Sequence, residues 1–162
     1  MQNAKDTFYL TLRNRLAALN PLRTMTLRAV SRPGILVEEA EAPAAQPQLD
    51  AFTLRWTGLQ ADLQLPAILA QMSCEIEYTT AGSQLNGGLD RGRALEEMDA
   101  ELLQLLYPYS AQKMDYTKTP AAALETFVFW SEPQFGPALT LRDRLSRTAT
   151  VTVLAFQEQG EK

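Results

Sequence analysis

The stretch Ile68–Thr79, ILAQMSCEIEYT, decides the fold class of this chain. From Met72 onward, apolar and polar side chains alternate, which is the period of a β-strand with one buried face. The predicted buried face carries Met72, Cys74, Ile76 and Tyr78. We therefore expect a core built around a long amphipathic strand, in which Cys74 is a buried and unreactive thiol.

Helices are predicted on both sides of this strand along the chain. The first is indicated by apolar residues at helical spacing, namely Phe8, Leu12, Leu16 and Leu19, with Asp6 as its N-cap and Asn20-Pro21 as its end. A polar loop over Thr80–Leu89 follows the strand, and Asp90 is expected to cap a second helix that ends at Leu106. Its apolar stripe is Leu95, Met98, Leu102 and Leu105, and its other face is acidic.

Shorter alternating runs predict the remaining strands. Thr24–Val30 and Ile35–Glu39 are expected to form a hairpin around Arg32-Pro33-Gly34, and Phe52, Leu54 and Trp56 mark the next strand. The segments Leu59–Pro66, Ala40–Gln48 and Ser110–Ala123 are expected to be connections without strands. The last strands are Leu124–Trp130 and Thr148–Gln157, and both are apolar on two faces, so both faces need cover.

The order of these elements predicts an α+β fold. We expect an antiparallel sheet with two helices packed on one face, in a single domain over residues 1–162. The sequence holds no run of about 18 apolar residues, so no membrane span is expected. Its N-terminus lacks the apolar centre of a signal peptide, and it has one cysteine, which favours an intracellular protein.

The sequence contains no histidine, which restricts its chemistry more than any other feature. Nucleophile–histidine pairs, imidazole metal ligands and the usual structural zinc sites are excluded. Two other patterns are better explained by structure than by chemistry. Gly87–Gly92 fits a loop with a helix cap better than a phosphate-binding site. Glu75 and Glu77 fit the outer face of a strand better than the paired acids of a glycosidase. No catalytic, cofactor-binding or metal-binding residue is predicted, and the chain is not expected to be an enzyme.

Charge is segregated along the chain despite a net value of −4. Residues 1–32 carry six basic side chains against Asp6 alone, whereas the predicted helix Asp90–Leu106 is acidic. Opposite charges on different flanks suit contacts between identical copies, and a stiff aromatic loop after Trp130 suits an apolar contact. The candidate interface residues are Arg13, Arg15, Glu97, Glu101, Trp130 and Phe135. Basic residues without interleaved aromatics do not indicate a nucleic-acid site.

The order of elements resembles that of phage tail terminator (tail-completion) proteins, which also occur in prophages. The stretches that carry the likeness are Cys74–Tyr78, Arg91–Leu106, Phe127–Trp130 and Arg147–Val153. The resemblance implies a virion-assembly subunit with no catalytic residues. It implies a ring of identical subunits, hexameric in known members, that caps the tail tube and meets the head connector. Such a protein is present in the bacterial cytoplasm during assembly and then in the virion or a tail-like particle.

Two alternatives stay open at this point. The long segments Ala40–Gln48 and Ser110–Ala123 depart from the shortest members of that family, so another neck component fits as well. A different class of function is a small-molecule-binding or weakly catalytic α+β domain, with its ligand between sheet and helix. A deep apolar pocket in a stable monomer would favour this second class.

Overall fold

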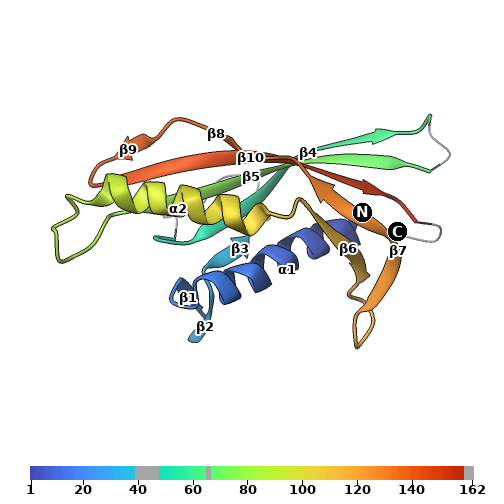
Figure 1. Cartoon of the computed structure of the whole chain (residues 1–162), viewed down its shortest axis with the longest axis horizontal. Helices are drawn as coiled ribbons and strands as arrows, with labels where there is room; N and C mark the ends of the chain where they lie inside the picture. The colour runs from blue at the N-terminus through green and yellow to red at the C-terminus, as the bar shows by residue number, and fades with distance from the viewer. Residues whose placement is uncertain (39–47, 65–66, 159–162) are drawn as a thin grey trace.

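A computed structural model of the chain describes residues 1–38, 48–64 and 67–158 (Figure 1). Within them the fold is mixed α and β, with two helices and a large, mostly antiparallel, curled sheet. The helices are α1 (Gln2–Leu19) and α2 (Arg91–Leu106). The order of the sheet is β3 (Ile35–Val37), β4 (Phe52–Asp62), β5 (Leu69–Thr80), β10 (Arg144–Phe156), β7 (Ala122–Trp130) and β6 (Ser110–Asp115).

Three shorter pairings complete the strand arrangement. Strands β8 (Gln134–Phe135) and β9 (Leu139–Leu141) both pair with β10, ahead of its segment that pairs with β7. Strands β1 (Thr24–Leu27) and β2 (Val30–Pro33) form a separate two-stranded ribbon. The sheet is therefore larger than the sequence predicted.

The decisive strand lies at the centre of the sheet. β5 pairs with β10 over its whole length, from Leu69 opposite Phe156 to Thr80 opposite Leu145. The predicted buried face is confirmed, because Met72, Cys74, Ile76 and Tyr78 are each at most 1% exposed. Long cross-strand pairing with one apolar face is what places this strand in the middle of the core.

Both helices contribute to one cluster of buried residues. The predicted stripe of α2 is buried and packs on β5 and β10, where the Tyr78 hydroxyl donates a 2.5 Å hydrogen bond to Asp99. α1 buries Phe8, Leu12 and Leu16 and packs mainly on β6. The expected N-cap is wrong: α1 begins at Gln2, and Asp6 accepts a hydrogen bond from the Gln2 side chain inside the helix.

The expected hairpin has its turn in a different place. The chain reverses at Arg28 and Ala29, which both have positive φ (50° and 63°), and β1 pairs with β2. Pro33 ends β2, and Gly34 donates its N–H to the carbonyl of Arg23. β3 then leaves the hairpin and pairs in parallel with β4. Parallel pairing needs a partner distant in the chain, which local turn signals do not reveal.

Two segments expected to be connections contain strands. β4 continues through Leu59 to Asp62, beyond a register shift next to Gly58, and Leu63 is 72% exposed. The segment Ser110–Ala123 contains β6, in which Lys113 is fully buried and donates from Nζ to the carbonyl of Phe156. A lysine at a buried position hides the alternation that would mark a strand. Residues 39–47 of the expected loop Ala40–Gln48 lie outside the described residues.

Candidate interaction surfaces

An aromatic patch lies on the face of β7 and β10 that is turned away from the core. Along β7, Val128 and Trp130 are buried, whereas Phe127 and Phe129 are 44% and 49% exposed. Leu154 pairs with Phe129 across the strands, and Phe156 is two residues further along the same face of β10. We call Phe127, Phe129, Leu154 and Phe156 the aromatic patch. The rings of Phe127 and Phe129 lie 6.2 Å apart between centroids.

Glutamines surround this patch on the neighbouring strands. Gln71 of β5 pairs with Leu154, Gln60 of β4 pairs with Gln71, and Gln112 of β6 pairs with Phe127. An exposed apolar patch with a polar rim is typical of a surface that another macromolecule covers. The sequence carried a signal for it, since β7 is apolar on both faces.

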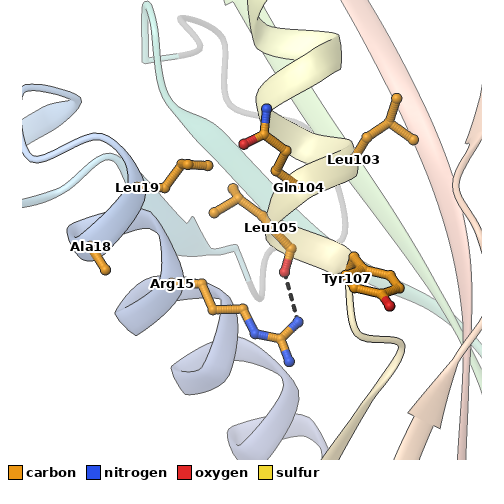
Figure 2. A pocket seen from close by; sticks show the side chains of 7 residues that line it. All are labelled: Arg15, Ala18, Leu19, Leu103, Gln104, Leu105 and Tyr107. Atoms are coloured by element: carbon orange, nitrogen blue, oxygen red, sulfur yellow. Dashed lines mark hydrogen bonds between the residues drawn. The ribbon is translucent and has the colours of Figure 1, made fainter.

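An open groove of about 680 Å³ lies between α1 and α2 (Figure 2). Leu19 of α1 and Leu105 of α2 point toward one another there, but Leu105 is fully buried, so the exposed apolar surface comes from Leu19, Leu103 and Tyr107. Leu103 and Tyr107 are 44% and 69% exposed. The remaining lining residues are Arg15, Ala18 and Gln104.

Arg15 forms one end of this groove and holds the two helices together. Its guanidinium donates hydrogen bonds of 2.9 Å to the carbonyl oxygens of Leu105 and Pro108 and one of 3.3 Å to that of Ser110. It also lies 5.4 Å from the centre of the Trp130 ring. Burial lowers the pKa of Arg15, because desolvation disfavours the cation. Both terminal nitrogens of Arg15 thus donate within the chain, which makes it a structural residue here.

A loop with two exposed leucines precedes α2. Leu85 and Leu89 are 99% and 93% exposed, and we call residues 83–90 the leucine loop. The carboxylate of Asp90 accepts hydrogen bonds from the Ser83 N–H (2.8 Å) and the Asn86 side chain (3.0 Å), which lower the pKa of Asp90 to about 2. Asp90 is at the expected N-cap position, but its side chain binds the loop and makes no bond to the helix.

The six predicted interface residues do not form one surface. Trp130 is only 4% exposed, and its indole N–H donates a 2.8 Å hydrogen bond to the carbonyl of Leu106. Glu101 is 7% exposed and pairs with Arg23. The expectation that these two side chains are exposed is wrong, because both lie on the faces of β7 and α2 that form the core.

The other predicted residues lie apart from one another. Glu97 is exposed on α2, and Phe135 is partly buried against the core. The guanidinium of Arg13 lies 5.9 Å from the centre of the Tyr9 ring, on α1. Of the six, Arg15 and Trp130 lie together, with the guanidinium over the indole ring. Their role in an interface stays a prediction, with Glu97 the best placed of them.

The groups considered for chemistry have ordinary structural surroundings. Glu75 accepts a 2.5 Å hydrogen bond from Arg55, which lies on the neighbouring strand. Cys74 is fully buried, and burial raises the pKa of its thiol to about 12. Across the described part of the chain, no group of three or more acidic or cysteine side chains is arranged to hold a metal ion. In the same residues, neither helix is long and apolar enough to cross a membrane.

No protein-family model and no curated protein sequence matches this chain. Among the described residues, the aromatic patch, the groove and the leucine loop each expose two or more large apolar side chains.

Proposed function

We propose that this chain is a structural subunit of a phage or prophage tail, of the tail terminator or tail-completion type. In this proposal identical copies form a ring at the head-proximal end of the tail and contact the tail tube and the head connector. The proposed location is the bacterial cytoplasm during assembly and then the virion or a tail-like particle. The proposal includes no catalysis and no cofactor, and it keeps both helices on one face of the sheet.

The aromatic patch is the observation that carries this proposal. A buried aromatic side chain removes about 150–250 Å² from water, so covering the exposed halves of Phe127 and Phe129 removes on the order of 200 Å². At about 25 cal/mol per Å², this contributes on the order of 5 kcal/mol. Association costs about 4–15 kcal/mol in lost freedom of motion, so the patch alone does not hold two copies together. We therefore expect weak association in dilute solution and stable assembly where several contacts act together, as on a tail tube.

A small-molecule-binding domain is the second candidate, and the groove favours it. Its volume of about 680 Å³ lies in the range of about 300–1,000 Å³ that is common for ligand sites. The groove is lined mainly by aliphatic carbon, and the hydrogen-bond donors of Arg15 are engaged by backbone carbonyls. Few polar groups are thus left to fix the orientation of a ligand, which makes this candidate the weaker one.

The test combines solution mass with binding to a template. Size-exclusion chromatography with light scattering across a wide concentration range measures self-association. Electron microscopy of terminator-free tail tubes, with and without the purified protein, shows whether it caps their ends. Rings at high concentration or capped tubes support the proposal. A protein that stays monomeric at every concentration, leaves tubes uncapped and binds an apolar fluorescent probe at one site would support the ligand-binding candidate instead.

A further inference from the structure

We infer that the far end of β4 pairs with the same segment of a second copy, in antiparallel orientation across a two-fold axis at Ala61. The contact joins residues 59–63 of the two copies into one continuous sheet. It is independent of the proposed function, because a two-fold contact pairs two copies and closes no ring by itself. A ring needs a separate, head-to-tail contact.

The far end of β4 is an open edge of the sheet. On one side β4 pairs with β5 as far as Asp62, opposite Leu69. On the other side β3 pairs only with Phe52–Leu54, and among residues 1–38, 48–64 and 67–158 no strand pairs with that edge beyond Leu54. Backbone N–H and C=O groups along an open edge can bind water or another extended chain, so the edge is a template for a further strand.

The same segment extends beyond the core. The far ends of β4 and β5 project past both helices (Figure 1), and all of residues 57–64 are exposed. Leu59 and Leu63 are 58% and 72% exposed. Natural edge strands often avoid pairing by carrying lysine or proline, and residues 57–64 contain neither. This edge therefore lacks the side chains that commonly keep another strand away.

The sequence of the segment is complementary to itself. Leu59-Gln60-Ala61-Asp62-Leu63 has a leucine at each end, polar residues in the second and fourth places and alanine in the centre. In an antiparallel pair centred on Ala61, Leu59 of each copy lies opposite Leu63 of the other. In the same register Gln60 lies opposite Asp62. An identical strand thus matches this edge at each position, which identifies the occupant as a second copy.

The leucines of the paired segments lie on the core face of the sheet. Leu59 is opposite the buried Met72 within the chain, and Ala61 is opposite the buried Ala70. Leu63 is two residues beyond Ala61 and continues the same side of the strand. Pairing brings four leucine side chains together across the two copies, and it covers apolar surface that one copy leaves in water.

The polar side chains of the segment lie on the opposite face. Asp62 accepts a 2.9 Å hydrogen bond from the Gln64 N–H. A carboxylate accepts several hydrogen bonds, so Asp62 can also receive the side-chain amide of Gln60 from the other copy. The two-fold axis repeats this bond, and the pair therefore contains it twice.

The size and position of the contact determine its strength. Pairing with β3 ends at Leu54, five residues before Leu59, so β3 and the second copy do not compete for the same part of the edge. Stable complexes bury about 1,200–2,000 Å² in total, and five residues from each copy form a smaller contact. We therefore expect a weak dimer that forms at high protein concentration.

Disulfide formation in a single-cysteine variant tests the register. Ala61→Cys places the two thiols opposite each other, where Cα atoms are about 4.5–5.5 Å apart and a disulfide can form. In the control Thr57→Cys, strand rise separates the two positions by about 26 Å. Both positions are exposed and the native Cys74 is buried. With copper phenanthroline as oxidant, we expect Ala61→Cys to form linked dimers at least tenfold faster than the control, and equal rates would overturn the inference.

Two substitutions of Gln60 test its pairing with Asp62 and have opposite expected signs. Gln60→Lys places a cation opposite each Asp62 and should lower the dissociation constant of the dimer at least threefold, whereas Gln60→Glu should raise it at least threefold. Sedimentation equilibrium measures both, and thermal unfolding checks that the fold is unchanged. The same substitutions at Gln84, which is exposed in the leucine loop, control for net charge and should have little effect. Equal effects at the two positions would contradict the register.

The two proposals fail in different experiments. If the native protein forms rings or caps tail tubes, but Ala61→Cys links no faster than Thr57→Cys, the two-fold contact is wrong and the proposed function stands. If Ala61→Cys links at the expected rate, but the native protein neither forms rings nor caps tubes, the two-fold contact stands and the proposed function fails.

Discussion

Arg15 of α1 donates a 2.9 Å hydrogen bond to the carbonyl oxygen of Leu105, in the last turn of α2. The last carbonyls of a helix have no partner within the helix, and a cation near them is favoured by the helix dipole. The same guanidinium also donates to the carbonyl oxygens of Pro108, in the turn after α2, and of Ser110, the first residue of β6. One side chain thus fixes the end of α2, the following turn and the wall of the groove.

Replacing Arg15 should therefore destabilise the fold. Arg15→Met leaves three carbonyl oxygens without this donor, and hydrogen bonds to a charged group contribute about 1.5–3 kcal/mol. We expect a loss of about 3 kcal/mol in the free energy of unfolding, measured by urea denaturation. The control Arg13→Met removes only a cation–π contact with Tyr9 and should cost less than about 1 kcal/mol. Similar losses in both variants would show that Arg15 has no such role.

Reversing the charge at Glu101 should lower the free energy of unfolding more than reversing the charge at Glu97. Glu101 is buried and pairs with Arg23, and removing one partner of a buried pair costs about 3–5 kcal/mol. Glu97→Lys changes an exposed side chain and should alter stability by less than about 0.5 kcal/mol. Thermal or urea unfolding of the two variants measures the difference. Only Glu97 is therefore suitable for testing assembly.

The thiol of Cys74 should be inert in the native protein. Burial raises its pKa from 9.0 to about 12, so the reactive thiolate is scarce at neutral pH. A thiol reagent should label the native chain far more slowly than the chain unfolded in urea. Because the folded pKa is the higher one, this group's contribution to stability is complete below about pH 9 and is lost as pH rises toward 12. Cys74→Ala should flatten the alkaline loss of stability over that window, and an unchanged slope would contradict the assignment.

The two exposed phenylalanines should matter for assembly and not for folding. Phe127→Ser with Phe129→Ser removes side chains that face solvent, so the free energy of unfolding should change by less than about 1 kcal/mol. Capping of tail tubes should fall at least tenfold. The control Val128→Ser, between them on β7, places a hydroxyl in the core and should cost about 2 kcal/mol or more. Loss of stability in the double variant would mean that the aromatic patch is part of the fold.

The leucine loop should loosen when Asp90 is replaced. Asp90→Ala removes the acceptor of the Ser83 N–H and of the Asn86 side chain. Amide hydrogen exchange at Ser83 should become faster, whereas exchange in β5 should stay unchanged. Hydrogen bonds from Ser83 and Asn86 lower the pKa of Asp90 from 3.8 to about 2, so this support is present above about pH 3.8 and is lost as pH falls through about 2. Unchanged exchange at Ser83 would show that the loop is held by other contacts.

Sequence reasoning succeeded where a single element carries its own periodicity. The buried faces of β5 and α2 were predicted correctly, because one side of each element meets the core. The stripe of α1 was predicted correctly for Phe8, Leu12 and Leu16, but Leu19, in its last turn, is 43% exposed. The sequence indicated that the strand carrying Phe127 and Phe129 has apolar side chains on both faces. Cys74 was predicted to be buried for the same reason.

Only the tertiary structure decided which apolar or charged face is exposed. Trp130 and Phe129 are neighbours in the sequence, yet Trp130 is buried and Phe129 is not, because the Trp130 ring packs against Phe8 of α1 and its indole N–H binds the Leu106 carbonyl. On α2, Glu101 is buried and Glu97 is exposed. Glu101 pairs with Arg23, which is distant from it in the sequence. β6 was missed because Lys113 occupies a buried position whose partner, the carbonyl of Phe156, is 43 residues away. The local pattern determined the two helices and the long central strand, whereas contacts between distant residues determined β6, the pairing of β3 and the exposed faces.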